Sequence, residues 1–583
     1  MSDAALRDRA KRAGLAPDWI DAAGREQHVC DDTLAAVLEA LGPEEAQTHE
    51  DSREELQSRC WTTDDAAPGR RLTALAVQLY SLRGSQGFGD LRALKDFARH
   101  AAGFGIDAIA VSPAHAPRMA SLSASPYAPS SRLFLNPLYA DVNLAGTAAT
   151  PNGDDGELID WPRAGRAKMD ALRHAYRNFT DEGQLGTFVC QGGARLLDHA
   201  RFEALDAYFC DRSIMRWRDW PVCYRDARGA AVEAFARAHA QEVRFHLFCQ
   251  WLADRSLAQA HQSARARGMA IGLIADIAVG MSPDGSHAWS APDETLNGLT
   301  IGAPSDIFNP QGQNWGLTAL SPSGLRKGGF AGFVETLCAA MRHAGGVRID
   351  HAMGLQRLWV IPEGADPGQG VYLQYPLRHL LARLCDQSRA CRTIVIGEDL
   401  GTVPEGFRSA LHSAGVLGME VLWFQRDYHR SGKPFVAAQR WSKHAAALTT
   451  THDLPTLAGW WCGRDIDWLE RLQRASEHGD FRAERRVRGE DRTKLWSVIG
   501  AGVAQPPGDE PQAAVPAALD FVARTPCPLA VVAVEDVLGL VEQPNIPGTV
   551  DEHPNWRRRL PSGDIFASDI VRRNLEMLRR GRR

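Results

Sequence analysis

The amino-acid sequence predicts an α/β protein: a (β/α)8 or TIM barrel with large, mainly helical insertions between strands and a short helical N-terminal segment. Eight short apolar runs recur along the chain, they are near-continuous rather than alternating, and helical patterns separate several of them. Continuous apolar strands suit a parallel sheet that is buried on both faces. On pattern alone, a doubly wound open sheet is an equal alternative.

The eight candidate strands are bounded by Gly, Pro, Asp or Asn. In chain order they are residues 74–80, 106–112, 269–276, 346–350, 393–398, 418–424, 445–451 and 529–536. After the first strand, Leu91, Leu94, Phe97, Ala98 and Ala101 recur with the spacing of one helix face. Strands that alternate with helices in this way favour the barrel.

The strands are unevenly spaced, which predicts insertions. We expect an N-terminal helical segment and linker over residues 1–71, and a catalytic barrel over 72–583 with insertions at about 113–268, 281–344 and 463–528. The stretch from Asn297 to Gly316 is rich in Gly, Pro and Asn. It is interpreted either as a lid over a site at the barrel mouth or as a plain surface loop.

The composition narrows the class of partner. The 583 residues are 44% hydrophobic and 23% charged, with a net charge of −5, so neither nucleic acid nor an anionic membrane surface is predicted as a partner. No apolar run approaches the roughly 18 residues needed to span a bilayer, and the charged N-terminus does not resemble a signal peptide. Eleven cysteines without a C-x-x-C motif favour a reduced, cytoplasmic protein.

Acidic residues follow five of the candidate strands. They are Asp276, Asp350, Glu398 with Asp399, Asp453, and Glu535 with Asp536. In a barrel the carboxyl ends of all strands face one mouth, so these acids are expected to converge there. A single acid at such a position is more often a helix cap, but five are harder to explain in that way.

Two basic residues accompany these acids. Arg348 lies two residues before Asp350, so alternation along a strand places both side chains on one face. A guanidinium beside a carboxylate keeps the carboxylate ionised, as a nucleophile requires, although a structural ion pair is the alternative. His452 precedes Asp453 and could donate hydrogen bonds to substrate hydroxyls.

Clustered acids with one arginine suggest glycosidic chemistry by a nucleophile and an acid/base. Metal-dependent hydrolysis also uses clustered acids, but no H-E-x-x-H motif or paired-histidine spacing is present, so no metal site is predicted. The G-x-S-x-G and Walker-type phosphate-binding motifs are absent as well. No cofactor is expected.

Seven segments in the right order resemble the amylomaltases, the 4-α-glucanotransferases of glycoside hydrolase family 77. They are LYSLRGSQGFGDL (79–91), SPYAPSSRLFLNPLY (125–139), GAPSDIFNPQGQNWG (302–316), RIDHAMGLQRLWVIPEG (348–364), IGEDLGTVPEGF (396–407), THDLPTLAGWW (451–461) and NIPGTVDEHPNWRRRL (545–560). The resemblance extends from about Leu75 to Leu560, which is the whole predicted barrel.

The resemblance implies a role for each matching residue. Asp350 should be the nucleophile, Glu398 the general acid/base, and Asp453 the stabiliser of the transition state. The residues implied to bind the glucan are Arg348, His452, Asp276, Tyr127 (stacked on the sugar), Trp289 (near the acceptor), Pro304 (in the loop over the cleft), and Asn545, Gly548 and Thr549 (at the pocket rim).

Two differences from known carbohydrate-active enzymes narrow the activity that the resemblance implies. The Asn-His pair that follows the matching acid in α-amylases is missing after Asp276, which argues against an α-amylase proper. Ala128 stands where many relatives have Gln, so one substrate contact differs there. In addition, about 70 residues precede the barrel, too few for the long β-rich extension of the larger relatives.

The implied activity is transfer of an α-1,4-glucan segment from a maltodextrin donor to the 4-OH of an acceptor glucan or glucose, by a retaining double displacement. Two alternatives stay open: a maltodextrin hydrolase on the same scaffold, and a non-catalytic glucan-binding protein. The hydrolase shares every step up to the glycosyl-enzyme, and only the fate of that intermediate differs. A binding protein would be expected to lose an acid, yet Asp350, Glu398 and Asp453 are all present.

Overall fold

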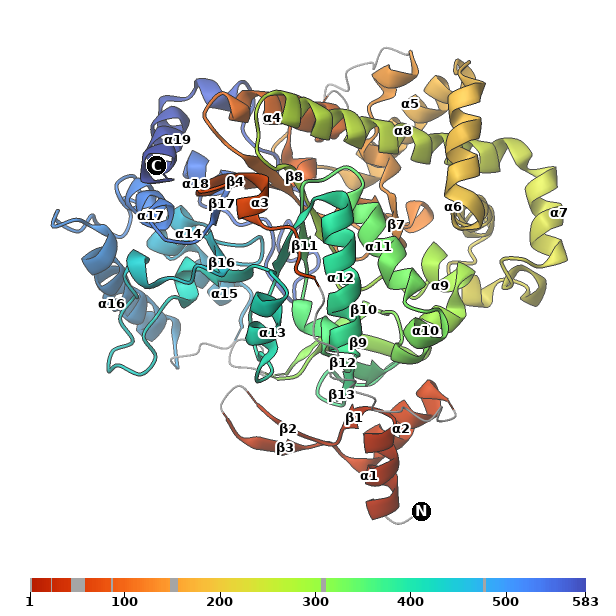
Figure 1. Cartoon of the computed structure of the whole chain (residues 1–583), viewed down its shortest axis with the longest axis horizontal. Helices are drawn as coiled ribbons and strands as arrows, with labels where there is room; N and C mark the ends of the chain where they lie inside the picture. Colours follow the sequence, from red (N-terminus) through yellow and green to blue (C-terminus); the bar gives the residue numbers. More distant parts are fainter. Residues whose placement is uncertain are drawn as a thin grey trace.

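The computed structural model describes residues 3–21, 24–42, 58–84, 87–146, 156–305, 311–474 and 479–582. Its centre is an eight-stranded parallel sheet with the strand order β14-β11-β8-β5-β4-β17-β16-β15 (Figure 1). A parallel bridge between Ile396 and Leu417 joins the two outer strands of that order. The sheet is therefore a closed (β/α)8 barrel with its strands in chain order, as the sequence predicts.

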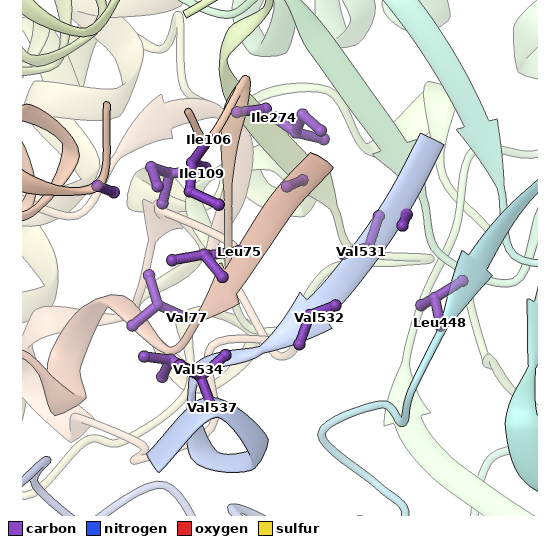
Figure 2. Packing of buried hydrophobic residues seen from close by; sticks show 14 of the residues in the cluster. Leu75, Val77, Ile106, Ile109, Ile274, Leu448, Val531, Val532, Val534 and Val537 are labelled. Carbon is purple, nitrogen blue, oxygen red and sulfur yellow. The ribbon is translucent and has the colours of Figure 1, made fainter. Parts of the chain in front are cut away.

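Each candidate strand corresponds to one strand of the barrel. The bounds are β4 Leu72–Val77, β5 Ala108–Val111, β8 Gly272–Ile277, β11 Gly346–Ile349, β14 Ile394–Gly397, β15 Gly418–Val421, β16 Ala445–Leu448 and β17 Leu529–Ala533. Leu75, Val531 and Val532 are at most 6% exposed, and Figure 2 shows them on the neighbouring strands β4 and β17. Burial on both faces explains why these strands are continuous apolar runs.

Helices follow most strands. After β4 comes α4 (Leu91–Ala102), whose buried face consists of the five apolar residues predicted from their spacing. After β5 come α5 (Trp161–Arg177), α6 (Glu182–Cys210), α7 (Ala230–Ala238) and α8 (Ala240–Ala266). After β8 come α9 (Ser286–Ser290), α10 (Pro322–Lys327) and α11 (Ala331–Met341).

The helices that follow β11 in the chain belong to the second half of the barrel. They are α12 (Leu377–Cys391), α13 (Phe407–Ser413), α14 (Leu457–Cys462), α15 (Arg464–Arg471), α16 (Phe481–Ile499), α17 (Ala514–Ala523), α18 (Val534–Leu538) and α19 (Asp569–Arg582). No helix in the described ranges is long and apolar enough to cross a membrane.

A second, five-stranded antiparallel sheet lies beside the barrel, and the sequence analysis did not predict it. Its order is β1 (Leu15–Ala16), β13 (Val371–Gln374), β12 (Arg357–Pro362), β9 (Leu299–Ala303) and β10 (Gln313–Leu317). The stretch Asn297–Gly316, predicted to be a loop, therefore contains two paired strands, although residues 306–310 at its tip lie outside the described part. The buried run Leu358–Ile361 was the signal that could have revealed this sheet.

The N-terminal segment contains helices α1 (Asp3–Arg12) and α2 (Asp31–Leu41), as predicted, with a hairpin of β2 (Asp18–Ile20) and β3 (Glu26–His28) between them. Its strand β1 pairs with β13, so the segment completes the second sheet (Figure 1). The predicted linker contains one helical turn, α3 (Thr63–Ala66), which a capping box at Thr62 and Asp65 stabilises. A further short hairpin, β6 (His115–Ala116) with β7 (Ser131–Leu135), follows β5.

Candidate active site

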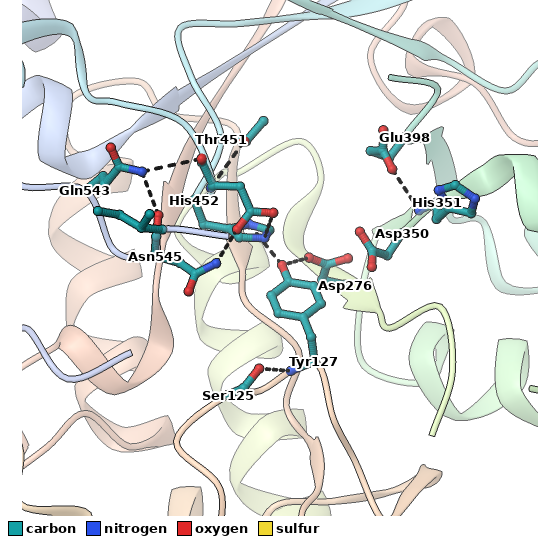
Figure 3. A network of polar contacts seen from close by, with 12 residues as sticks. Ser125, Tyr127, Asp276, Asp350, His351, Glu398, Thr451, His452, Gln543 and Asn545 are labelled. Carbon is teal, nitrogen blue, oxygen red and sulfur yellow. Dashed lines mark hydrogen bonds and ion pairs between the residues drawn. The ribbon is translucent and has the colours of Figure 1, made fainter. Parts of the chain in front are cut away.

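Four neighbouring or facing strands bring the predicted residues together at the carboxyl end of the barrel. Asp276 lies in β8 and Arg348 is its direct partner in β11. Asp350 follows β11, Glu398 follows β14, and His452 and Asp453 come after β16. Figure 3 shows Asp276 at the centre of one space, with Glu398 and Asp350 on one side and His452 and Asn545 on the other. The convergence predicted for the strand-end acids is thus present.

Arg348 connects two of the acids. Its Nη1 donates to both carboxylate oxygens of Asp276, at 2.8 and 2.9 Å, and its Nη2 donates to Oδ1 of Asp350 at 2.9 Å. The side chain of Arg348 is only 17% exposed. An ion pair in such a site is little screened by solvent, so it holds the Asp350 carboxylate in one orientation.

Glu398 has an environment that suits a proton donor. Burial, reinforced by the nearby Asp350 carboxylate, raises the pKa of Glu398 to about 7, although Arg348 opposes this shift. The backbone N–H of Leu400 donates to Oε1 at 2.7 Å and that of His351 to Oε2 at 2.9 Å. Two fixed donors hold the carboxyl group in one orientation, and a pKa near neutrality lets it give and take a proton.

His452 and Asp453 form the opposite wall. The Tyr127 hydroxyl donates to Asp276 Oδ2 at 2.7 Å and lies 3.1 Å from Nδ1 of His452, which therefore acts as the donor to Tyr127. Nε2 of His452 lies 3.3 Å from Asp453 Oδ2. Burial lowers the pKa of His452, but Asp453 outweighs it and the pKa is raised overall. Both contacts fit an imidazolium, in which Nδ1 donates to the Tyr127 oxygen and Nε2 donates to Asp453.

Asn545 and Gln543 complete this wall. Nδ2 of Asn545 donates to Asp453 Oδ1 at 2.6 Å, and Nε2 of Gln543 donates to the carbonyl of Asn545 at 2.7 Å. Burial raises the pKa of Asp453, but His452 and Asn545 more than compensate, so that pKa is lowered overall and Asp453 is ionised at neutral pH. Gln543 was not among the predicted residues. The available signal was its position two residues before Asn545, where the last matching segment begins.

The ring of Tyr127 stacks on His452, with ring centroids 4.6 Å apart and an angle of 26° between the planes. The Tyr127 ring also contacts Trp556, with centroids 5.5 Å apart, and its stacking on a sugar stays a prediction. A pocket lined by Tyr127, Asp276, Arg348 and His452 opens beside it. Together these contacts place four of the predicted substrate-binding residues around one pocket.

The predicted place of Trp289 near the acceptor stays a prediction, but its side chain presents no exposed face. Its side chain is 1% exposed and packs in a cluster with Phe202 and Trp220. Its indole N–H donates to the carbonyl of Tyr224 at 2.9 Å. A side chain buried on all sides with its only donor satisfied packs as part of the core.

The other predicted residues lie on surrounding segments. Pro304 is buried just after β9, and the residues that follow it lie outside the described ranges. Gly548 has a left-handed φ of 72° and Thr549 donates from Oγ1 to the carbonyl of Ile546 at 2.7 Å, so both form a turn beyond Asn545. Their contacts with substrate stay predictions.

The hairpin of β9 and β10 reaches the site through Trp315. The Trp315 ring meets the imidazole of His351 edge-on, with centroids 5.2 Å apart. His351 directly follows Asp350, and its N–H holds Glu398. The segment predicted as a lid or surface loop therefore contacts the catalytic centre through a strand of the second sheet.

Two strand-end acids have structural roles. Asp399 is 3% exposed, accepts from the N–H of Met419 at 2.8 Å, and pairs with Nε of Arg408 at 2.7 Å. Asp536 is fully buried and accepts from the N–H of Leu457, the first residue of α14, at 2.6 Å. Sequence reasoning placed both acids at the barrel mouth, but the side chains satisfy backbone donors instead.

We expect Asp399→Asn to reduce stability and leave turnover intact. The amide loses the charge that pairs with Arg408 and presents an NH2 group toward a donor, which costs about 1–3 kcal/mol. Thermal unfolding and kcat on maltotriose measure the two effects. A drop in kcat at unchanged melting temperature would contradict this assignment.

Among the described residues, no group of three or more His, Cys, Asp or Glu side chains has the arrangement of a metal site. The site's chemistry is carried by two differently tuned carboxyl groups, one ion-paired and one protonatable near neutrality, at the mouth of a (β/α)8 barrel. Carboxyl groups gathered in this way at a barrel mouth are typical of a carbohydrate-active enzyme.

Comparisons with known proteins identify the family to which the chain belongs. The profile of glycoside hydrolase family 77, described as "4-alpha-glucanotransferase", matches residues 77–564. The chain belongs to this family and is a transferase that acts on glucans. The resemblance seen in the sequence is thereby confirmed.

Two relatives and two solved structures are representative. The "4-alpha-glucanotransferase" of Mycobacterium tuberculosis is 36% identical over 537 residues, covering 86% of this chain and 72% of the relative. That of Haemophilus influenzae is 30% identical, covering 88% of this chain and 79% of the relative. The amylomaltase of Corynebacterium glutamicum superposes with a TM-score of 0.84 at 24% identity, covering 98% and 99% of the two chains. The Streptococcus agalactiae amylomaltase in complex with acarbose gives 0.73 at 17% identity, covering 87% of this chain and 98% of that one, which shows a shared fold.

Proposed function

We propose that the enzyme transfers α-1,4-glucan segments by a double displacement in which Asp350 is the nucleophile and Glu398 the acid/base. The observation that carries this proposal is the division of labour between the two carboxyl groups. Arg348 pairs with Asp350 at 2.9 Å, while Glu398 has its pKa raised to about 7 by burial. The first step needs an ionised nucleophile and a protonated acid at the same pH, and the ion pair and the raised pKa of Glu398 support this assignment of roles.

In the first step Asp350 attacks the anomeric carbon while Glu398 protonates the departing glycosidic oxygen. In the second step Glu398 removes the proton from the incoming 4-OH as that oxygen displaces Asp350. Asp453, held ionised by His452 and oriented by Asn545, is placed to accept hydrogen bonds from sugar hydroxyls as positive charge develops on the ring. Arg348, His452, Asp276 and Tyr127 would surround that sugar.

We propose that maltodextrins are the donors and that maltodextrins or glucose are the acceptors. We further propose that the reaction involves no nucleic acid, membrane, metal or other cofactor. Residues 72–583 would form the catalytic unit and residues 1–71 a segment that supports it. All eleven cysteines lie in described residues and are free thiols, which favours a cytoplasmic location.

Incubation with maltotriose tests the proposal. A transferase converts it into glucose and a ladder of longer maltodextrins, with little net increase in reducing ends. Collapse to glucose and maltose with a rise in reducing ends would instead identify a hydrolase. Unchanged maltotriose together with measurable binding would identify a glucan-binding protein.

The rate should fall on the alkaline side of neutrality. Glycosylation requires protonated Glu398, whose pKa is about 7, so kcat/KM should be level just below that pH and drop about tenfold per pH unit above it. A pH profile of kcat/KM with maltotriose measures this limb. A profile that stays flat to pH 9 would exclude Glu398 as the titrating acid.

We expect Trp315→Ala to raise the share of hydrolysis. The substitution removes the contact between the β9–β10 hairpin and His351 and opens the site to water, while the three carboxyl groups stay in place. The ratio of reducing-end release to glucan redistribution is the measurement. Trp61→Ala is the matched control, because Trp61 is also half-buried but bridges to Ile394 at the other end of β14. Equal ratios in both variants would show that solvent is excluded by other segments.

A further inference from the structure

Arg132 is a buried arginine close to the site but outside the proposed catalytic machinery. It lies in β7 and is 8% exposed. Its Nη1 donates to two consecutive carbonyl oxygens, those of Ala278 and Val279, both at 3.0 Å. These two residues follow directly after β8, the strand that carries Asp276.

Arg132 has no acidic partner in the described ranges, and its Nε is buried without a hydrogen bond. Burial lowers the pKa of Arg132 to about 10, which still leaves it cationic at neutral pH. Burying a charge without a counter-ion costs free energy, which the hydrogen bonds to the two carbonyl oxygens must offset. Those contacts fix one stretch of backbone, residues 278–279.

That stretch is joined to the site in two ways. Arg132 lies five residues after Tyr127 in the same segment, so its contacts hold the Tyr127 segment against the end of β8. The Tyr127 hydroxyl then reaches Asp276 at 2.7 Å. His115, from the strand paired with β7, adds a second contact by accepting the N–H of Ala278 at 3.4 Å.

Asp276 in turn determines where Arg348 points. It receives both bonds of Arg348 Nη1, and the same guanidinium holds Asp350 through Nη2. Displacement of the β8 end would therefore rotate Arg348 and release Asp350.

We propose that Arg132 is a positioning residue, which fixes the end of β8 against the Tyr127 segment and thereby orients Asp276, Arg348 and the nucleophile Asp350. The inference rests on the proposed catalytic roles. It assigns Arg132 no contact with the glucan. Its effect is therefore expected in turnover more than in substrate binding.

The test compares Arg132→Gln with Arg582→Gln. Arg582 is a close match, because it is 7% exposed, has its pKa lowered to about 10 by burial, and donates to the carbonyls of Thr525 and Cys527 before β17. It lies at the opposite end of the barrel from the site. Both variants should lose thermal stability. Only Arg132→Gln should lower kcat, by about 10- to 100-fold, with KM changed less than threefold, as for groups that orient catalytic ligands.

Arg132→Lys is a second test variant that keeps the proposal testable if Arg132→Gln does not fold. It retains the positive charge and should recover part of the lost kcat, as should millimolar guanidinium added to Arg132→Ala. Full kcat in Arg132→Gln or Arg132→Lys, or an equal loss in Arg582→Gln, would overturn the inference.

Hydrogen exchange supplies a readout that does not depend on activity. The amides of residues 276–280 should exchange faster in Arg132→Gln or Arg132→Lys than in the unsubstituted enzyme or Arg582→Gln. Unchanged exchange there would refute the positioning role whatever the activity. An unsubstituted enzyme that does not redistribute maltotriose, but shows the expected exchange pattern, would instead refute the proposed function.

Discussion

Asp350→Asn should lower kcat for maltotriose redistribution by about 10⁴-fold or more, the scale seen when a catalytic nucleophile is removed. The amide is nearly isosteric with the carboxylate and can still accept from Arg348, so the fold should persist. It cannot form the glycosyl-enzyme, because the amide is a poor nucleophile. Single-turnover rates and a thermal melt measure the two expectations.

Asp399→Asn is the matched control for this substitution. It makes the same chemical change at a buried acid whose oxygens bind Met419 and Arg408 rather than face the pocket. Trapping the intermediate with a fluorinated glycosyl fluoride adds a direct check by peptide mass. An adduct on any residue other than Asp350 would refute the assignment.

Glu398→Gln should slow maltotriose by about 10²- to 10⁴-fold, the usual contribution of general acid–base catalysis. The glutamine carbonyl can still accept from one of the two backbone donors, Leu400 or His351, while its NH2 group faces the other. The amide cannot act as an acid. A glycosyl fluoride needs little protonation of its leaving group, so glycosylation of Asp350 by that donor should stay fast. The intermediate should then accumulate, because no base activates the acceptor.

The ratio of the two donor activities is the decisive measurement for Glu398. Added azide should react with the accumulated β-glycosyl-enzyme without a base and give an α-glycosyl azide, the product of net retention. An equal loss on both donors would mean that Glu398 acts on the fold rather than on the leaving group. The alkaline limb near pH 7 should also disappear in this variant.

The barrel could be predicted because its determinants are local. Runs such as that of β17 are apolar at every position, since both faces of a parallel strand are buried in this fold. The acids at the strand ends followed from the same reasoning, because parallel strands in a barrel open to one mouth. Asp276, Asp350, Glu398 and Asp453 could therefore be expected in one pocket before any contact was known.

The second sheet could not be predicted in the same way. Its strand β1 is two residues long, and β9 and β10 are bounded by the Gly and Pro residues that otherwise predict a loop. Their pairing joins residues as distant as Leu15 and Leu373, which no local pattern encodes. The burial of Trp289 was unpredictable for a related reason: whether a tryptophan faces solvent or a core depends on which helices pack around it.

The sequence by itself determined the fold class and the family and predicted the catalytic carboxyl groups, because strand periodicity and motif spacing are properties of the chain alone. The tertiary structure decided how those groups are tuned. The pKa of Glu398 depends on burial and on the distance to Asp350, and the charge of Asp453 depends on His452 and Asn545. Desolvation and Coulomb energy are functions of three-dimensional distance, so they are fixed only when the strands close into the barrel.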